Sequence, residues 1–401
     1  MEMIALMLSL AALLGAGTLA AAEAPSQIWD LDALMVAPET HPAPEGFAEE
    51  GVQALFYDGL PWQGNPTRVF AYMGVPEVAA GESVPGMVLI HGGGGTAYAK
   101  WVRMWNERGY AAIAMDTCGA TPGEDPREHP RHDFSGPPGW GAWAQMDWPR
   151  EDQWQYHAIA DVLLAHSLLA AQPGVDPGRI GVTGISWGGY LTSFIAGVDP
   201  RYRFAIPVYG CGFYADTHFG AMVDRLTDEQ GARWYEWWDP MHYLPSADLP
   251  MLWVNGTNDF AYWLPGWQQS YRAAPGPHTL SVRVRMPHGH GPGWAPEEIY
   301  LFADSILRGG EPLARIVEQQ REGMAVSARV ECPVALERAE LVYTCATGIW
   351  PERQWEAAPA EIDGETIRAT LPEATAVYFL NVIDARGLVV STEYEDLAPA
   401  Q

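Results

Sequence analysis

Runs of consecutive apolar residues alternate with amphipathic segments through the first three quarters of the chain. Residues 87–90 (MVLI) and 110–115 (YAAIAM) are almost unbroken apolar runs, which is typical of parallel strands covered on both faces. Residues 98–108 lie between them, have a helical pattern and end at Gly109. Strand, helix and strand of these lengths predict a βαβ unit, and therefore a parallel sheet with a right-handed crossover.

The same alternation of apolar strands and amphipathic helices continues to residue 307 and predicts an α/β domain with helices on both faces of its sheet. A long amphipathic helix is expected over residues 151–171, with its apolar stripe toward the sheet. A closing helix is expected over residues 296–307. Further strands are predicted at residues 67–75, 204–208, 251–254 and 280–286.

Two long stretches interrupt this rhythm. Residues 118–150 are rich in Pro, Gly and Trp, and residues 209–250 are rich in aromatic side chains. Both are too long for ordinary connections in a compact domain. Loops of this kind are commonly lids or binding loops, so we expect them to border a site. Residues 25–66, rich in Pro and Gly, are predicted to wrap around the domain.

The character of the chain changes after residue 310. No helical period is present beyond Gln320, and turn dipeptides such as Asp363-Gly364 separate short alternating runs. This pattern predicts a small antiparallel β-sandwich over residues 311–401, like an immunoglobulin or fibronectin domain. Its strands are expected at residues 324–330, 338–344, 366–371 and 376–383.

The strongest chemical signal is the stretch RIGVTGISWGGY at residues 179–190. A short apolar strand leads to Ser186, and a helical pattern follows it. Gly184 and Gly188 flank the serine in a G-x-S-x-G pattern, the nucleophile elbow. The spacing has a steric cause, because strand and helix pass so closely that residues two before and two after the serine must lack bulk. The pattern predicts Ser186 as a nucleophile at the start of a helix.

Candidate partners for this serine follow two later strands. Asp259 comes shortly after the predicted strand at residues 251–254, and the last sheet strand leads into His288 and His290. In folds with a nucleophile elbow, the residues that act together follow one another along the chain in the order Ser, then Asp or Glu, then His. Asp116 precedes the serine and is therefore the weaker candidate for the acid. We expect His288 to be the base, with His290 as the alternative.

An oxyanion needs two fixed N–H donors near the serine. One is expected from Trp187, which directly follows the nucleophile. The other is expected from the HGGGG run after residue 90, at Gly93 or Gly94, where the main chain can approach a substrate closely. Tryptophans in the two long insertions suit stacking on a sugar ring or an apolar acyl group. Residues predicted to line the substrate pocket are His91, Trp140, Trp143 and Trp238.

No metal or other cofactor is expected. The H-x-H pair at residues 288–290 has no obvious carboxylate partner, so we do not predict zinc there. Acidic and histidine side chains also gather at residues 128–133, but the prolines and arginines around them favour a solvated loop. The site is therefore predicted to act through its protein groups.

Charge and the N-terminal residues bear on partners and location. The net charge of −27 argues against nucleic acid and anionic membranes as partners. Residues 4–22 are apolar and end in small residues, so we predict a signal peptide over residues 1–24 and a secreted or periplasmic protein. No membrane contact is expected after cleavage. Glu2 stands where a positive residue is usual, and a retained membrane anchor is the alternative.

The four cysteines permit disulfides in an exported chain. Cys332 and Cys345 flank a predicted hairpin in the C-terminal segment, and pairing across it is one possibility. Cys118 and Cys211 each follow a predicted sheet strand, so a bond between them at one sheet edge is the other.

The motifs HGGGGTAY, GISWGGY, VNGTNDFAY and MPHGHGPGW together resemble the α/β-hydrolase superfamily. Within it, the chain resembles the branch that holds acetyl xylan esterases, dienelactone hydrolases and prolyl-oligopeptidase-like enzymes, over about residues 51–310. The resemblance implies triad roles for Ser186, Asp259 and one of the two histidines. The C-terminal sandwich departs from prolyl oligopeptidases, which carry an N-terminal propeller. This difference weakens a peptidase interpretation.

Three functional hypotheses follow. The first is a secreted serine esterase that acts on short acyl esters of carbohydrates through residues 25–310. The second is a peptidase or amidase with the same triad. The third is a non-catalytic protein in which the sandwich, residues 311–401, binds a carbohydrate or another partner.

Overall fold

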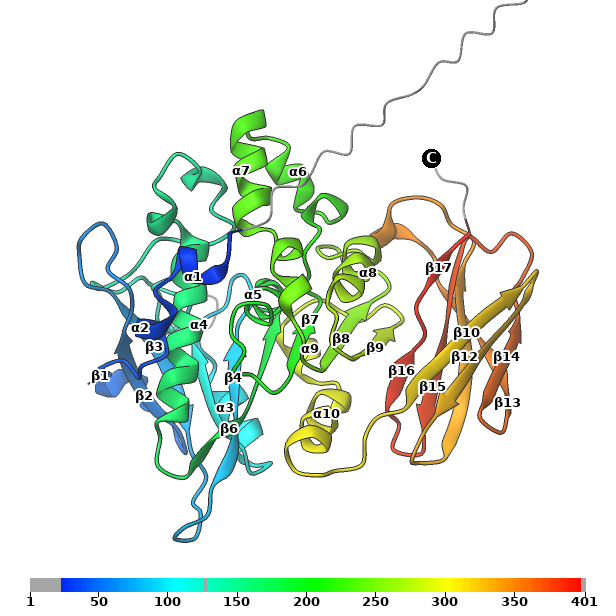
Figure 1. Ribbon diagram of the computed structural model, residues 1–401, viewed down its shortest axis with the longest axis horizontal. Helices are drawn as coiled ribbons and strands as arrows, with labels where there is room; N and C mark the ends of the chain where they lie inside the picture. The colour runs from blue at the N-terminus through cyan, green and yellow to red at the C-terminus, as the bar shows by residue number, and fades with distance from the viewer. Residues whose placement is uncertain (1–22, 126–127, 398–401) are drawn as a thin grey trace, which may run out of the picture.

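The computed structural model describes residues 23–125 and 128–397. A mostly parallel sheet runs through the larger part of the molecule, and an antiparallel sandwich stands beside it (Figure 1). The strands of the main sheet lie in the order β1-β2-β3-β5-β4-β6-β7-β8-β9. Those from β5 to β9 are parallel, and β1 to β3 are antiparallel. The bounds are β1 Thr40–Pro42, β2 Gln53–Asp58, β3 Arg68–Gly74, β4 Val84–Ile90, β5 Ala111–Met115, β6 Val175–Ile185, β7 Ala205–Val208, β8 Met251–Gly256 and β9 His278–Arg283.

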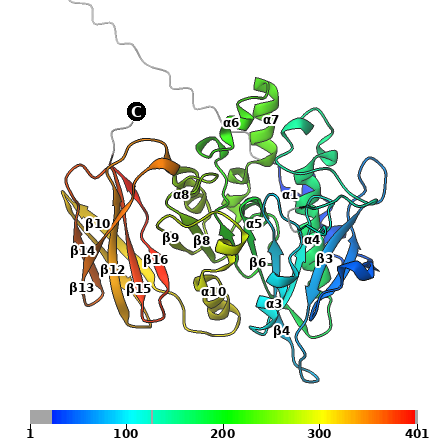
Figure 2. The ribbon, with the colours of Figure 1, turned by 180° about the vertical axis from the view of Figure 1, so that it is seen from behind.

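Helices cover both faces of this sheet (Figures 1 and 2). Side chains of α4, α5 and α8 belong to one apolar core, and those of α3 and α10 to the other. Every residue of β5, β7 and β8 is buried, as the apolar runs predicted. The bounds are α3 Ala99–Asn106, α4 Trp154–Ala170, α5 Trp187–Ile195, α8 Leu264–Ala273 and α10 Glu297–Leu307. The predicted fold class, an α/β sheet with a C-terminal β-sandwich, is confirmed.

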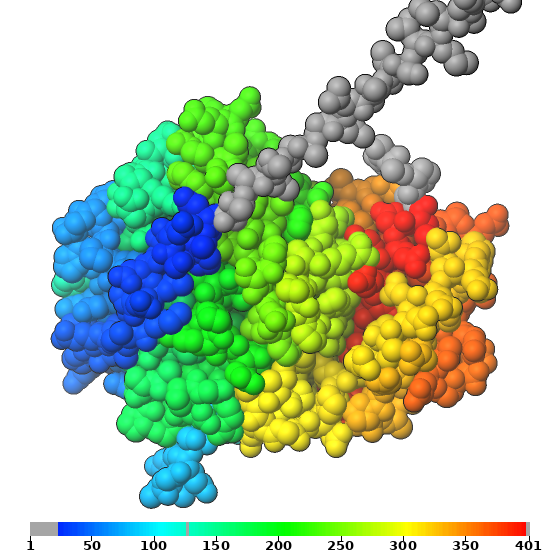
Figure 3. All heavy atoms as spheres, viewed as in Figure 1, coloured from blue at the N-terminus to red at the C-terminus, as the bar shows by residue number. Residues whose placement is uncertain are grey.

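The N-terminal segment differs in part from the prediction of a wrapping segment. Two short helices, α1 Pro25–Ile28 and α2 Leu31–Leu34, lie against the domain, with Trp29 buried and stacked on Tyr156 at 5.6 Å. This blue segment crosses the face of the molecule in Figure 3. After it, β1 and β2 extend the sheet, and the sequence analysis did not predict these two strands. The predicted signal peptide lies outside the described residues, apart from its last two positions.

The two insertions are built differently. The first, residues 118–150, is largely irregular in its described part. It includes a turn of 3-10 helix at Trp143–Gln145, and another, Arg150–Asp152, begins at its last residue. The second, residues 209–250, is mainly helical and includes α6 Gly220–Val223 and α7 Asp228–Trp238. Thr227 begins α7 with a capping box, because its hydroxyl accepts a hydrogen bond from the Gln230 N–H.

The sandwich is joined to the main sheet edge to edge. Strand β16 Val389–Ser391 pairs with β9 at Ser391 and Leu280. The Asn381 side chain donates a hydrogen bond to the Val282 carbonyl of β9 at 3.1 Å, which is a second contact in the seam between the sandwich and the main sheet. The remaining strands are β10 Arg315–Glu322, β11 Ala325–Glu331, β12 Leu336–Thr344, β13 Glu356–Asp363, β14 Thr366–Thr370, β15 Val377–Asp384 and β17 Glu395–Asp396.

All four cysteines are free thiols in the structure, so neither of the two considered disulfides is present. The hairpin expected between Cys332 and Cys345 is wrong, because β12 runs as one strand between them. Nine extended residues span about 30 Å, which keeps the two thiols far apart. Within the two described ranges, no helix is both long and apolar enough to cross a membrane.

Candidate active site

Ser186 occupies the sharp turn between β6 and α5. Its backbone has φ 60° and ψ −116°, in the left-handed region that a non-glycine residue rarely adopts. The flanking glycines are required sterically. A Cβ on Gly184 would lie 2.2 Å from the Gly188 carbonyl oxygen, and one on Gly188 would lie 2.0 Å from the Ile90 carbonyl oxygen. The turn therefore holds the serine hydroxyl at the carboxyl end of the sheet.

We expect the elbow glycines to be essential for stability as well as geometry. Gly188→Ala should lower the free energy of unfolding by roughly 3 kcal/mol, because the new methyl group meets backbone that cannot move aside. Gly231→Ala, within α7, is the matched control, since its Cβ would make only ordinary contacts of 3.7 Å with Val223 of α6. Urea denaturation of both variants measures the difference. Equal stability of the two variants would contradict this account of the elbow.

A row of hydrogen bonds joins the serine to a histidine and an aspartate. His288 Nε2 lies 2.8 Å from Ser186 Oγ, and His288 Nδ1 lies 2.6 Å from Asp259 Oδ2. The other oxygen of Asp259 accepts hydrogen bonds from the N–H groups of Ala261 and Tyr262 at 2.9 and 2.7 Å. The carboxylate is fully buried. Because an ionised carboxylate only accepts, Nδ1 carries the proton and Nε2 is free to accept from the serine hydroxyl.

The other candidate acid, Asp116, is not part of the hydrogen-bonded row of Ser186, His288 and Asp259. It follows β5, is buried, and one of its oxygens accepts the N–H groups of Cys118 and Ala120, both at 2.7 Å. Its second oxygen lies 3.6 Å from His91 Nε2. Burial raises the pKa of Asp116 above its ordinary value. It therefore shapes the turn that begins the first insertion.

His290 has a different neighbourhood from His288. Its Nε2 accepts the Gly92 N–H at 2.9 Å, and its Nδ1 lies 3.3 Å from the Tyr98 hydroxyl. Burial lowers the pKa of His290 to about 3, so this ring stays neutral at ordinary pH. Since Nε2 accepts, the ring proton is on Nδ1 and points to Tyr98. His290 thus fixes the glycine loop after β4, while His288 contacts the serine.

The glycine loop lies directly beside the nucleophile. A Cβ on Gly92 would lie 2.9 Å from Ser186 Cβ, and one on Gly93 would lie 2.9 Å from the Trp187 ring. As the first residue of α5, Trp187 has no acceptor for its N–H within the helix. The predicted donors Trp187 and Gly93 are therefore neighbours. Gly94 has φ +68°, and its carbonyl accepts from His129 at 3.1 Å.

Two aromatic rings enclose the imidazole of His288, and the sequence analysis missed both. Tyr209 stacks on it with ring centroids 4.4 Å apart, and its hydroxyl donates to the Gly289 carbonyl. Phe260 packs on it at 4.6 Å, yet its side chain is 55% exposed. The available signal was position, because Tyr209 directly follows β7 and Phe260 directly follows Asp259.

The predicted pocket residues separate into two groups. Trp140 and Trp143 are partly exposed and pack on the Trp187 ring, at centroid distances of 6.5 and 5.6 Å. Trp238 is fully buried at the end of α7, where its indole N–H donates to Gln153, so its predicted place in an open pocket is wrong. His91 is also enclosed, with its Nε2 accepting the N–H of Thr117 and its pKa lowered to about 4 by burial. These two side chains pack the scaffold under the site.

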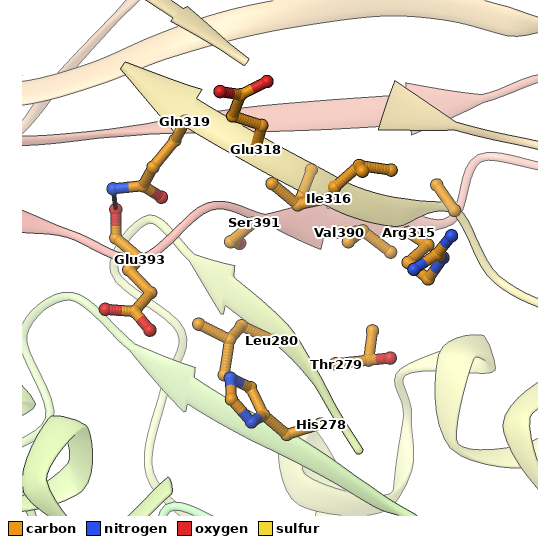
Figure 4. Close-up of a pocket in the computed structure, with 12 residues that line it drawn as sticks. His278, Thr279, Leu280, Arg315, Ile316, Glu318, Gln319, Val390, Ser391 and Glu393 are labelled. Carbon is orange, nitrogen blue, oxygen red and sulfur yellow. Dashed lines mark hydrogen bonds between the residues drawn. The ribbon is translucent and has the colours of Figure 1, made fainter. Parts of the chain in front are cut away.

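A cavity of about 280 Å³ lies elsewhere, in the seam between β9 and β10 (Figure 4). Polar and apolar side chains such as His278, Ile316 and Glu318 line it. The side-chain amide of Gln319, which also lines the cavity, donates a hydrogen bond to the Glu393 carbonyl at 3.4 Å. None of the predicted site residues is among its described lining. Among residues 23–125 and 128–397, no group of three or more His, Cys, Asp or Glu side chains is arranged to hold a metal ion.

Residues 142–291 match the Prolyl oligopeptidase family. Among curated proteins, a stretch of 95 residues, 22% of this chain, is 27% identical to the uncharacterized peptidase YuxL of Bacillus subtilis strain 168. That stretch spans only 14% of the length of YuxL.

Two solved structures share the fold of this chain. Acetyl xylan esterase from Paenibacillus sp. R4 aligns with a TM-score of 0.56 at 22% identity, covering 71% of this chain and 94% of that one. Acetyl xylan esterase 1 from Thermoanaerobacterium sp. JW/SL YS485 aligns with a TM-score of 0.53 at 17% identity, covering 66% and 88%. The family match covers the segment that holds Ser186, Asp259 and His288, and the likeness to these two structures shows that the chain has the α/β-hydrolase fold.

Proposed function

We propose that this chain is a serine hydrolase that cleaves carboxylic esters. The observation that carries the proposal is the hydrogen-bonded row of Asp259, His288 and Ser186. A serine hydroxyl is a weak nucleophile until a base accepts its proton, and the base must be held in one tautomer. The match to the prolyl oligopeptidase family, over the segment that contains all three residues, supports a serine hydrolase.

In the proposed mechanism, Ser186 Oγ attacks the ester carbonyl carbon while His288 Nε2 takes the hydroxyl proton. Asp259 stabilises the imidazolium that forms, and the N–H groups of Trp187 and Gly93 bind the oxyanion. Nε2 then gives the proton to the leaving alcohol, and the C–O bond breaks to leave an acyl-serine. A water molecule, activated by the same nitrogen, releases the acid and restores the serine.

Short acyl groups on a carbohydrate are the proposed substrates. The acetyl xylan esterase from Paenibacillus sp. R4 is covered over 94% of its length by this chain, and its name specifies acetyl groups on a sugar polymer. The partly exposed Trp140 and Trp143, next to Trp187, offer aromatic surface of the kind on which sugar rings stack. A secreted or periplasmic location, proposed from residues 1–24, would suit an extracellular polysaccharide.

A panel of substrates tests the proposal and its rivals. Acetylated xylo-oligosaccharides and p-nitrophenyl acetate should be turned over, whereas peptide p-nitroanilides should react much more slowly. Faster cleavage of the peptide substrates would favour the peptidase alternative. Folded protein that neither turns over an ester nor reacts with a fluorophosphonate would favour a binding protein instead.

Phe260 is expected to contact the alcohol part of the ester. His288 delivers its proton to the leaving oxygen, and Phe260 is the exposed ring in contact with that imidazole. Phe260→Ala should therefore lower kcat/KM for p-nitrophenyl acetate about tenfold, which corresponds to the loss of one apolar contact. Methyl acetate, with the same acyl group and a minimal alcohol, should be affected less than twofold.

Phe134→Ala is the matched control for this prediction. Phe134 is 41% exposed and packs under the Arg68 guanidinium at 4.3 Å, away from His288. It should leave both kcat/KM values unchanged. An equal loss for the two esters in Phe260→Ala would mean that the ring supports His288 and does not contact the alcohol.

A further inference from the structure

The turn that carries Asp259 is held by the C-terminal sandwich. The side-chain amide of Asn258 donates two hydrogen bonds across the seam, to the Pro351 carbonyl at 2.9 Å and to the Arg353 carbonyl at 2.8 Å. Its amide oxygen accepts from the Thr257 hydroxyl at 2.9 Å. Both N–H groups and the oxygen of this one amide are therefore occupied, and the residue next along the chain is Asp259.

The strand end that leads to His288 is tied to the same loop. The Arg285 guanidinium donates to the Gln354 side chain at 3.2 Å and to the Trp355 carbonyl at 3.3 Å. The Arg285 N–H donates to the Thr257 hydroxyl oxygen at 3.0 Å, which links this strand end to the aspartate turn. One short stretch of the sandwich, residues 351–355, thus contacts the segments that carry both the acid and the base.

This stretch of the sandwich is itself well anchored. Arg353 donates to the Gly348 carbonyl at 2.8 Å, and its guanidinium lies 3.8 Å from the Trp350 ring centroid. Trp355 is buried and packs on Phe379 of β15 at 5.8 Å. In Figures 1 and 2 the orange connection between β12 and β13 reaches across to the α8 side of the main sheet. A buried, packed loop of this kind can fix the position of what it binds.

We propose that Asn258 is a positioning residue for the Asp259–His288 pair, and that the sandwich is a structural part of the catalytic unit. This inference rests on the proposed serine hydrolase mechanism. The donated hydrogen bonds fix the turn, and the turn fixes the carboxylate that orients the imidazole. A displacement of about 1 Å in such a pair lowers turnover by about a hundredfold. The sandwich acts here through the hydrogen bonds that its carbonyl groups accept from Asn258.

Asn258→Ala tests the proposal, with kcat and KM measured on p-nitrophenyl acetate. We expect kcat to fall by about tenfold to a hundredfold, with KM within about threefold of wild type, because the substrate surface is unchanged. Asn65→Ala is the matched control, as Asn65 donates only within an exposed turn, and it should behave as wild type.

Arg353→Ala tests the same contact, between Asn258 and the loop at residues 351–355, by a change in the sandwich. The Arg353 side chain stabilises the loop at residues 351–355 but does not contact the turn that carries Asp259. Arg353→Ala should therefore lower kcat as Asn258→Ala does, but by a smaller factor. If Asn258→Ala does not fold, the kcat of Arg353→Ala still tests the proposal. Wild-type protein that is inactive would overturn the proposed function itself. Active wild type, with both variants matching Asn65→Ala in kcat and KM, would overturn the role of the sandwich.

Discussion

Ser186→Ala is expected to lower the turnover of p-nitrophenyl acetate by about 10⁴-fold or more. In the proposed mechanism the hydroxyl oxygen forms the acyl-enzyme, and the methyl group of alanine cannot replace it. The fold should be kept, because alanine keeps the Cβ of serine in the same strained turn, and the Ser186 hydroxyl contacts only His288 among the hydrogen bonds found. Steady-state kinetics and far-UV circular dichroism measure the two quantities separately.

Ser305→Ala is the matched control for that variant. Its hydroxyl donates to the Phe302 carbonyl within α10 and takes no part in the hydrogen-bonded row of Asp259, His288 and Ser186. A fluorophosphonate probe should label wild type and Ser305→Ala and leave Ser186→Ala unlabelled. Unchanged turnover in Ser186→Ala would remove the acyl-enzyme mechanism.

His288→Ala should lose about 10⁴-fold in kcat, whereas His290→Ala should lose only about tenfold. His288 lies within hydrogen-bond distance of Ser186 Oγ, and in the proposed mechanism it exchanges a proton with that hydroxyl. His290 acts indirectly, through its hydrogen bond from the Gly92 N–H, and its removal loosens the loop that borders the serine. Kinetics of the two single variants on p-nitrophenyl acetate give the comparison.

The pH profile separates these two histidines further. Burial lowers the pKa of His290 to about 3, so this ring does not change its charge between about pH 5 and pH 9. A limb of the pH–rate profile near neutrality must then belong to another group and should persist in His290→Ala. Loss of that limb in His290→Ala, or equal losses of kcat in both variants, would contradict the assignment.

Local signals in the sequence were sufficient for the central strands of the main sheet. Apolar runs such as residues 87–90 and 110–115 indicated buried parallel strands, and both occur, as β4 and β5. The G-x-S-x-G pattern indicated the turn at Ser186, because its glycines are required by contacts only a few residues away or on the adjacent strand. Amphipathic strands at the domain edges, such as β2 and β10, have weaker patterns and were missed.

The aromatic insertions show the limit of such signals. A tryptophan in a long Pro- and Gly-rich stretch has the same local pattern whether it packs inside its own insertion or faces a substrate. Trp238 packs inside, because α7 turns its indole toward Gln153 at the start of α4. Trp143 comes from the other insertion and stays partly exposed beside Trp187. This difference depends on partners far apart in the chain.

The sequence by itself determined the central strands and helices of the α/β part, the strained serine turn, and the placing of an acid and two histidines after the later strands. These features depend on periodicity, steric bulk and chain order, which are local or nearly so. Only the tertiary structure decided that His288 and not His290 meets Ser186, and that a loop of the sandwich holds Asn258. Both outcomes depend on distances of a few ångströms between segments about 90 to 100 residues apart, and packing alone sets such distances.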